Sequence, residues 1–442
     1  MRSRLLIALA AALCACSPAA ASTGRISSDP LQAQEWWLAR IGADQSPAPG
    51  PGVPIVVVDS GVDPSHPEFA GRPNTTFLND QTVDGTDEHH GTAIASLAAA
   101  PENGVGIVGV YPQAVLQSFD ASPAALISEF GAVQGVDAAA QHCPAVISLS
   151  FGGGSRSAGL ENAILGAVHN GCLVVAAAGN SGLQGNPTTY PAAYPHVLTV
   201  GATDQNDSVA PFSTLSPAVD VAAPGVAMVA AVPVSHDPSG YSTNLSGTSF
   251  AAPLVSAAAA WVWTLRPTLD VTQIFELLRL TARDIGTPGR DSGSGYGIVN
   301  IPSALTAAAP APDPSEPNDN IEQIKPGGLF PDGRPLLPTA AIPSNRIAAR
   351  LDNAEDPRDF YRITVPAHRV VRAAVSAGGA AAARIWGPLT VGVDEGVLSR
   401  RRDLKGPLIR GGNKPSVAYV EVLLTGRAPT ASYVLSVTAS KR

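Results

Sequence analysis

Short apolar runs alternate with helix-like stretches between about residues 53 and 305. The runs VPIVVVD, AVISLSF, LVVAAAGN, HVLTVGAT and VDVAAPG are apolar throughout, not at every second position. Strands with this pattern lie in parallel sheets whose two faces are both covered by helices. The pattern therefore predicts an α/β domain built on a mostly parallel sheet.

The pattern changes after the segment TAAAPAPDPSEPNDN, which is rich in Pro, Ala and acidic residues. Beyond it, the runs DFYRITVPA, RVVRAAVSA, VAYVEVLL and SYVLSVTA alternate or are β-branched, and Gly, Pro and Asn separate them. Such runs are typical of antiparallel strands. We expect a linker over residues 309–320 and a small all-β sandwich domain over residues 321–442.

The N-terminus, MRSRLLIALAAALCACSPAAAS, has the layout of an export signal over residues 1–21: two Arg, a short apolar run and then small residues. The run is too short to span a bilayer. Two alternatives remain open for where the signal ends. LCAC resembles a lipobox, in which Cys16 becomes a lipid anchor to the membrane, whereas PAAAS suits cleavage after Ala21. We expect an exported protein, either secreted or anchored on the cell surface by lipid, and little room for a folding propeptide before the first domain.

Composition narrows the classes of function. The chain is 45% hydrophobic and 14% charged, which suits a globular protein with large cores. Its formal net charge is −8, from 28 basic and 36 acidic residues. No basic patch of the kind that phosphate backbones attract is evident, so nucleic acid is not an expected partner.

Two cysteines remain once the export signal is set aside. Cys143 and Cys172 each precede an apolar strand, and a helix-like stretch separates the two strands. In a βαβ unit these strands are parallel neighbours, so their starting ends can bring the sulfurs together. The sequence thus favours a disulfide in an oxidising compartment, with two inert buried thiols as the alternative.

Three polar residues lie where ligands of α/β sheets bind. Asp59 ends the run VPIVVVD, His90 begins a helix, and Ser249 opens the long apolar helix GTSFAAPLVSAAAAW. Taken singly, each has an ordinary explanation as a turn former or helix cap. Taken together, they supply a nucleophile, a base to activate it and a carboxylate to orient that base.

The segments DSGVDPSHPEF, HGTAIAS and GTSFAAPLV resemble the three signature motifs of the subtilisin-like serine proteases, and the resemblance covers about residues 29–308. It implies a subtilisin-like three-layer α/β fold and a serine endopeptidase that acts on extended polypeptides with the triad Asp59, His90 and Ser249. AAAGNSG resembles the family's oxyanion segment and implies that Asn180 donates to the oxyanion. No cofactor is required for this chemistry.

The same resemblance implies where a substrate binds. Ser150, Phe151 and Gly152 follow the strand ISLS, where an extended substrate adds as a β-strand. Thr189 stands where a glycine often lies in the specificity pocket, so we expect a preference for small or medium apolar residues before the cleaved bond. The resemblance also implies a cis Tyr190–Pro191 peptide bond; the alternative is the trans bond, which X–Pro steps adopt more often.

A structural calcium is a further implication of the resemblance. Its side-chain ligands would be Glu68 and Asn103, and its carbonyl ligands Pro101, Val105 and Ile107; the alternative is an ordinary surface loop. Glu68 stands where the family usually has the shorter Asp.

The remaining expectations concern the ends of the domains. Trp36 and Trp37 are expected to pack against the α/β domain, and His89 to be a solvent-exposed neighbour of His90. EPNDNIEQ and EDPRDFYRITVPAHRVV resemble the bacterial pre-peptidase C-terminal (PPC) domain. Two rival functions remain open: a surface binding protein that keeps a protease scaffold without turnover, and a transferase that passes the acyl group to an amine.

Overall fold

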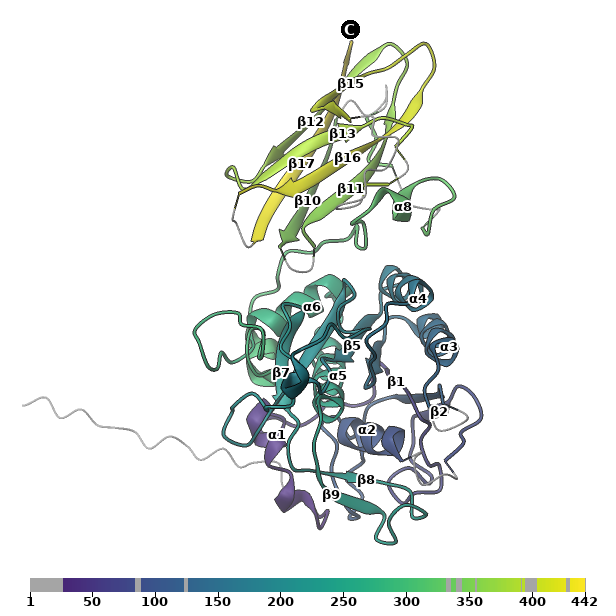
Figure 1. Cartoon of the computed structure of the whole chain (residues 1–442), viewed down its shortest axis with the longest axis vertical. Coiled ribbons are helices and arrows are strands. Elements are labelled where there is room, and N and C mark those ends of the chain that lie inside the picture. Colours follow the sequence, from purple (N-terminus) through teal and green to yellow (C-terminus); the bar gives the residue numbers. More distant parts are fainter. Residues whose placement is uncertain are drawn as a thin grey trace, which may run out of the picture.

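The computed structural model describes residues 27–83, 89–122, 126–330, 335–338, 344–353, 356–390, 392–393, 404–426 and 430–441. The predicted export signal and Cys16 lie outside the described residues. Two bodies are visible, an α/β domain that contains the first strands and a β domain that ends with the C-terminus (Figure 1).

The α/β domain is built on a seven-stranded sheet in the order β2-β3-β1-β4-β5-β6-β7, and every neighbouring pair is parallel. The inner strands β1, β4, β5 and β6 are buried along their whole length, as the apolar runs predict. The strands are β1 (Ile55–Asp59), β2 (Thr75–Phe77), β3 (Leu116–Asp120), β4 (Val146–Leu149), β5 (Leu173–Ala177), β6 (Val197–Thr203) and β7 (Val219–Pro224).

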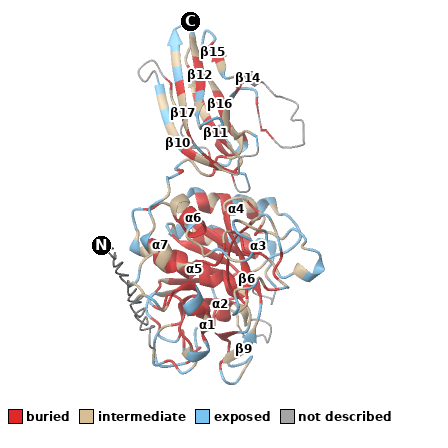
Figure 2. Ribbon diagram, turned by 90° about the vertical axis from the view of Figure 1, so that its left-hand side faces the viewer, coloured by how far each residue is buried: buried red, intermediate tan, exposed pale blue. Residues whose placement is uncertain are grey.

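Helices cover both faces of this sheet and form two separate cores. Helices α1 (Trp36–Ile41), α2 (His90–Ala99), α5 (Thr248–Leu265) and α6 (Val271–Leu280) contribute to the larger core. Helices α3 (Glu129–Ala139) and α4 (Ala158–His169) contribute to the smaller core on the other face. Buried residues fill the sheet and the helices α2 and α5 (Figure 2). The predicted three-layer α/β architecture is confirmed.

Short elements complete the α/β domain. An antiparallel pair, β8 (Met228–Ala231) and β9 (Tyr241–Leu245), precedes α5. The others are helix α7 (Ile301–Thr306) and the 3-10 helices η1 (Gln32–Gln34), η2 (Ala140–His142) and η3 (Gly182–Gln184). Trp37 is fully buried and Trp36 packs against the same core, as expected of both.

By length and composition alone, one helix of the described residues could cross a membrane. This helix is α5, and most of it is buried in the larger core. It follows that its apolar character serves the packing of the α/β domain.

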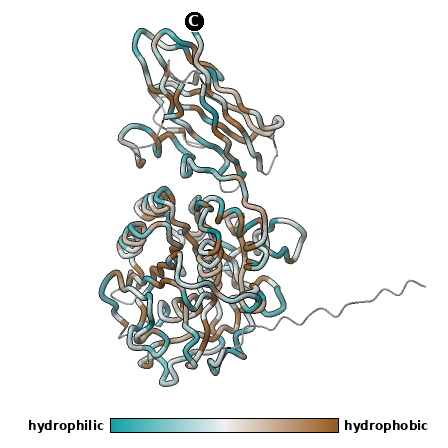
Figure 3. Tube along the Cα trace, turned by 180° about the vertical axis from the view of Figure 1, so that it is seen from behind, coloured by the Kyte–Doolittle hydropathy of each residue, from teal (hydrophilic) through white to brown (hydrophobic). Residues whose placement is uncertain are grey.

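The β domain is a sandwich of two four-stranded antiparallel sheets around a third core. Hydrophobic segments run along its strands and through the interior of the α/β domain (Figure 3). One sheet has the order β10-β17-β12-β15, the other β11-β16-β13-β14. Their bounds are β10 (Ser344–Asp352), β11 (Arg358–Val365), β12 (Arg369–Ser376), β13 (Ala381–Trp386), β14 (Leu404–Gly406), β15 (Leu408–Arg410), β16 (Ser416–Leu424) and β17 (Thr430–Lys441).

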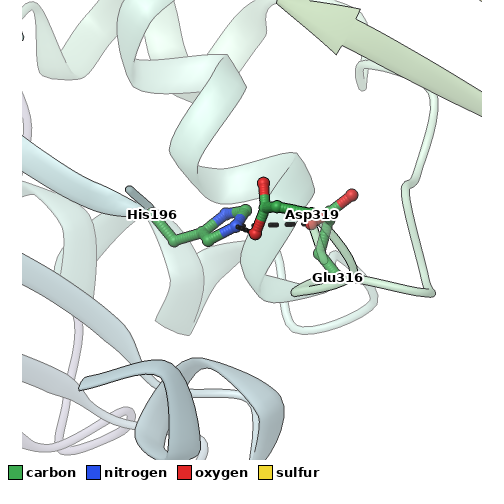
Figure 4. Close-up of side chains that lie close together, drawn as sticks. All are labelled: His196, Glu316 and Asp319. Carbon is green, nitrogen blue, oxygen red and sulfur yellow. Dashed lines mark hydrogen bonds and ion pairs between the residues drawn. The ribbon is translucent and has the colours of Figure 1, made fainter. Parts of the chain in front are cut away.

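Part of the segment predicted as a linker is buried. Within residues 309–320, Asp313 and Asn318 are buried, and helix α8 (Ile321–Ile324) follows directly. His196 of the α/β domain contacts Glu316 and Asp319 of this segment (Figure 4). The segment is therefore part of the junction between the two domains.

The cysteine prediction is confirmed. Cys143 and Cys172 form a disulfide with a Cα–Cα distance of 5.0 Å, at the starting ends of the parallel neighbours β4 and β5.

Candidate active site

The first element of the site is a contact between a strand end and a helix start. Asp59 ends β1 and is 1% exposed, and its Oδ1 lies 2.8 Å from Nδ1 of His90. The Ser60 N–H donates to the same oxygen at 2.8 Å. Because a carboxylate only accepts hydrogen bonds, Nδ1 of His90 carries the proton and Nε2 is left as an acceptor.

A close approach of two backbones places His90 next to Asp59. A Cβ atom on Gly91 would lie 2.2 Å from the carbonyl oxygen of Gly61, so only glycine lets α2 begin this close to the loop after β1. The Gly91 N–H also donates to Ser60 Oγ at 3.0 Å.

The electrostatics of His90 reflect two opposing effects. Burial lowers its pKa, but the negative charge of Asp59 and the hydrogen bond to it outweigh burial, so the pKa lies above its usual value. Asp59 therefore stabilises the imidazolium that forms when His90 accepts a proton.

Ser249 is the second residue of α5, and its hydroxyl is turned toward Ser150. Ser249 Oγ donates to the Ser150 carbonyl at 2.8 Å, and Ser150 Oγ donates to the Ser249 carbonyl at 3.0 Å. The next residue, Phe250, lies 5.8 Å from His90 between ring centroids. No hydrogen bond joins Ser249 to His90 among the described residues; the Ser249 hydroxyl donates to Ser150 instead.

The side-chain amide of Asn180 is held by the residue before Ser249. Asn180 Oδ1 accepts from the Thr248 N–H at 2.8 Å and from the Thr248 hydroxyl at 2.9 Å. Thr248 Oγ1 in turn accepts from the Gly179 N–H at 3.1 Å. With its oxygen held in this way, the exposed amide directs its NH2 group away from Thr248, as an oxyanion donor needs. Sequence reasoning missed Thr248, although it stands inside the motif GTSFAAP.

The predicted substrate residues lie together. One groove is lined by His90, Phe151, Gly152 and Tyr190, among other residues. Thr189 lies beside Gly152 of this groove: a Cβ on Gly152 would lie 2.7 Å from Thr189 Cγ2, and one on Gly179 would lie 2.8 Å from Thr189 Oγ1. The threonine thus lies between the two backbone segments at Gly152 and Gly179.

Two local expectations have clear outcomes. The Tyr190–Pro191 peptide bond is cis, as predicted. The expectation for His89 is wrong: its side chain is half-buried and stacks on His236, with 3.8 Å between ring centroids. The stacking partner comes from a loop about 150 residues later in the chain, which the local sequence does not indicate.

Hydrogen bonds from neighbouring groups hold the Glu68 carboxylate, one of the two side chains predicted to bind calcium. Glu68 is fully buried and accepts from the Tyr241 hydroxyl at 2.8 Å, the Ile107 N–H at 3.0 Å and the Asn103 amide at 3.4 Å. Calcium needs converging oxygen ligands, whereas these groups present N–H and O–H donors to the carboxylate. Burial raises the pKa of Glu68 to about 7.

The rest of that loop is also held by hydrogen bonds. Asp29 Oδ1 accepts from three successive N–H groups, those of Asn103, Gly104 and Val105. The fifth predicted ligand, Pro101, is half-buried in the same loop. Asp29 and Tyr241, which sequence reasoning did not single out, hold the loop where a metal was expected.

The subtilase family model matches residues 50–297, a range that includes Asp59, His90, Asn180 and Ser249. Subtilisin DY of Bacillus licheniformis is 36% identical over 259 residues, which are 58% of this chain and 91% of that protein. Subtilisin Savinase of Lederbergia lenta is 36% identical over 282 residues, which are 62% of this chain and 99% of that protein.

Solved structures agree on the fold. The psychrophilic subtilisin-like protease Apa1 from Pseudoalteromonas sp. AS-11 aligns with a TM-score of 0.54 at 21% identity, over 62% of this chain and 99% of that chain. A lanthipeptide protease aligns with a TM-score of 0.53 at 22% identity, over 64% and 98%. At these identities the likeness shows the fold alone, but together with the family match over more than half of the sequence it leads to one conclusion: the chain belongs to the subtilase family.

Proposed function

We propose that the chain is an exported serine endopeptidase that cleaves extended polypeptides through Asp59, His90 and Ser249. The observation that carries the proposal is the 2.8 Å bond between His90 Nδ1 and Asp59 Oδ1, next to the helix start that bears Ser249. That bond leaves His90 Nε2 as the free base, which a serine nucleophile requires. Membership of a family of serine proteases supports the same chemistry.

The reaction begins with a rotation of the Ser249 side chain from the Ser150 carbonyl toward His90. Ser249 Oγ then bonds to the substrate carbonyl carbon while its proton passes to His90 Nε2, and the carbonyl π electrons move onto oxygen. His90 returns the proton to the leaving amine as the C–N bond breaks. Water repeats the sequence on the acyl-enzyme, so the serine is restored.

The negative oxygen of the intermediate needs donors that are already in place. We assign this role to the Asn180 NH2 group and the Ser249 N–H at the start of α5. Loss of one such donor costs about 3 kcal/mol of barrier, or roughly 10²-fold in kcat. The bonds from Thr248 to Asn180 Oδ1 support this assignment because they fix the amide before substrate binds.

A fluorophosphonate probe tests the proposal, because it labels only an activated serine. We expect labelling of the wild-type protein, none of Ser249→Ala, and retained labelling of Ser150→Ala. Ser150 is the matched control, since its hydroxyl lies in the same pair of hydrogen bonds. If the folded wild-type protein is not labelled, the chain is instead a binding protein on a protease scaffold.

The acyl acceptor is tested separately. Product masses from a peptide substrate distinguish hydrolysis, which adds one water, from transfer to an amine. We expect hydrolysis products, and ligated or cyclic products would contradict the endopeptidase assignment.

For the rest of the chain, we propose export by the N-terminal signal and a PPC-like module in the β domain. The sandwich of two antiparallel four-stranded sheets is compatible with such a module. The mass of the mature N-terminus decides between cleavage after Ala21 and lipidation of Cys16. Retention of a lipid mass on a peptide that begins at Cys16 would establish the anchored form.

A further inference from the structure

The two domains carry opposite charge, which the near balance of the whole chain conceals. Residues 321–442 contain 18 of the 28 basic residues but only 10 of the 36 acidic residues. The other 320 residues contain 10 basic and 26 acidic residues. A chain divided in this way is typical of proteins in which one part binds a partner of the opposite charge.

Burial strengthens the positive charge at the surface of the β domain. Over the described residues from 344 to 441, every acidic side chain is buried: Asp352, Asp356, Asp359 and Glu421. In contrast, six basic side chains are exposed: Arg346, Arg372, Arg384, Arg410, Lys414 and Lys441. From residue 344 onward, the charges that the described surface presents are therefore positive.

The two sides of the sandwich differ in what covers them. Outside the sheet β11-β16-β13-β14, helix α8 lies beside β11 and shares a small hydrophobic core with Phe360, Trp386 and Tyr419 (Figure 1). Among the described residues, no hydrophobic cluster lies outside the sheet β10-β17-β12-β15. The outer side of this second sheet is the open face of the β domain.

The open face consists of small, aliphatic and basic side chains. Along its strands, every second residue enters the central core, as Leu351, Val371 and Leu435 do, so the residues between them point outward. The outward residues of the four strands are Ser, Thr, Ala, Val, Leu and Arg, and none of them is acidic or aromatic. Such a face suits a hydrophilic, negatively charged partner.

Three arginines lie near one another on the open face. Val370 of β12 lies opposite Arg410 of β15, so Arg372 and Arg410 are diagonal neighbours, with about 7–8 Å between their Cα atoms. Arg346 lies on the other side of β17, opposite Ser436. All three arginines are exposed, and none of their guanidinium groups bonds to another described residue. Strand β15 lies at the end of the molecule away from the α/β domain (Figure 1).

The side chains of the open face favour one class of anionic partner. The face lacks the aromatic side chains on which single-stranded bases stack. The exposed large hydrophobic residues described in the β domain, Leu329 and Leu389, lie outside this sheet, so they do not anchor it in a bilayer. Guanidinium groups pair bidentately with carboxylates, and Ser and Thr hydroxyls exchange hydrogen bonds with the hydroxyls of a sugar.

We propose that the open face binds an acidic polysaccharide. The carboxylates of the polymer pair with Arg346, Arg372 and Arg410, and its hydroxyls bond to Ser436 and Thr438 between them. A polymer repeats its charge along one chain, so several weak contacts act together. The α/β domain is acidic and is repelled by the same polymer, so the attachment leaves the proposed active site accessible. This binding does not depend on the proposed catalysis.

Binding of the full-length Ser249→Ala protein to immobilised polygalacturonate tests the open face, with dextran as the uncharged control. We expect binding to polygalacturonate alone, with an affinity that falls steeply between about 50 mM and 200 mM salt. Arg372→Gln/Arg410→Gln should lower the affinity at least about tenfold. Arg156→Gln/Arg384→Gln is the matched control, because it removes two positive charges elsewhere on the surface, and it should change the affinity less than about twofold.

The two double variants also identify binding that is not specific to the open face. All four substituted side chains are exposed, so both double variants should unfold at the same temperature as Ser249→Ala. An equal loss of affinity in both would overturn the proposal, because it would assign the binding to net charge. Absence of binding to polygalacturonate at the lower salt concentration would also overturn it.

Other occupants of the open face give different outcomes. Tighter binding to phosphatidylglycerol vesicles or to a DNA duplex than to polygalacturonate would overturn the proposal in favour of a phosphate-bearing partner. Sedimentation at low salt measures association with the acidic α/β domain of a second copy. We expect Ser249→Ala to be a monomer; a dimer that Arg372→Gln/Arg410→Gln dissociates would overturn the proposal in favour of self-association.

Discussion

A single carboxylate decides which nitrogen of His90 carries a proton. The Asp59 Oδ1 contact at 2.8 Å fixes the tautomer and raises the pKa of His90. Asp59→Asn keeps the shape but removes the charge, and its amide can present a donor to Nδ1. We expect kcat/KM to fall on the order of 10⁴-fold, as loss of this carboxylate does in other triads.

The dependence of activity on pH distinguishes an electrostatic role of Asp59 from a merely structural one. The base must be neutral to act, so activity rises as pH increases through the pKa of His90. Without Asp59 that pKa falls, and the acid limb of the residual activity should shift to lower pH. An unchanged acid limb in a folded Asp59→Asn protein would show that Asp59 does not influence His90 in the reaction.

Substitutions of Thr189 test its proposed role in substrate preference. Its Cγ2 and Oγ1 lie where side chains at Gly152 and Gly179 would stand, so it limits the depth of the proposed specificity pocket. The wild-type enzyme should cleave after Ala in preference to Phe. Thr189→Gly should change the Phe to Ala ratio of kcat/KM in favour of Phe by roughly tenfold or more.

Two matched variants control this experiment. Thr189→Val keeps the β-branched shape and should keep the preference, whereas Thr189→Ser removes only Cγ2 and should lie between wild type and Thr189→Gly. Cleavage after Phe that equals or exceeds cleavage after Ala in the wild type would refute the proposed preference.

At the residue scale, the sequence predicts chemistry better than side-chain contacts. The motifs at Asp59 and His90 fix both partners of the 2.8 Å bond. They do not predict the contact of Ser249 Oγ with the Ser150 carbonyl, which depends on a side-chain rotation. Nor does SHPEF indicate that Glu68 meets the hydroxyl of Tyr241, which follows 173 residues later.

At the scale of elements, the order of β4 and β5 makes the disulfide possible. The bond joins Cys143 and Cys172, which are 29 residues apart in sequence and precede neighbouring parallel strands. A crosslink of this span restricts the unfolded chain. Replacing both cysteines with serine should lower the free energy of unfolding by about 2–4 kcal/mol.

Chemical denaturation of the double variant measures this cost. Wild-type protein treated with reductant is the matched control and should unfold at the same denaturant concentration as the variant. If the variant and the oxidised wild type unfold at the same midpoint, the bond adds nothing to stability.

The strands of the parallel sheet are predictable because their apolar runs need cover on both faces. The burial of the connecting segment is not predictable in this way. Its Pro and acidic residues resemble a solvated linker, but Asp313 and Asn318 are buried because the β domain and His196 pack around them. Composition indicates the conformation that a segment favours on its own, but here contacts with the neighbouring domain bury part of it.

At the scale of the whole molecule, a second cluster of charges joins the two domains. Arg279 in α6 is 2% exposed and lies 3.3 Å from Asp220 of β7 and 3.1 Å from Glu276. It also donates to Asp352 of the β domain at 3.1 Å. The i, i+3 spacing within α6 indicates Glu276, but nothing in the sequence around Arg279 identifies Asp220 and Asp352, because they come from two other elements.

Arg279→Met tests how far this cluster supports the molecule. The variant keeps much of the apolar volume but leaves Asp220, fully buried, without its cation. Breaking a buried ion pair costs about 3–5 kcal/mol of unfolding free energy. Arg156→Met is the surface control: the Arg156 side chain is 65% exposed and lies 2.7 Å from Glu161, so its loss should cost less than about 1 kcal/mol.

The dependence on pH identifies the cause of the loss. Burial raises the pKa of Asp220 to about 6 even though Arg279 opposes that shift, so removing Arg279 raises the pKa further. An acid whose folded pKa exceeds its unfolded pKa loses stability as pH rises between the two values, because the folded state binds the proton more tightly. The difference in unfolding free energy between wild type and Arg279→Met should therefore grow as pH rises above about 6, where Asp220 loses its proton in the wild type but keeps it in the variant, and should be smallest below that pH. A difference that stays constant over this range would assign the loss to packing of the guanidinium against Tyr296 and Phe275 and not to the charge of Asp220.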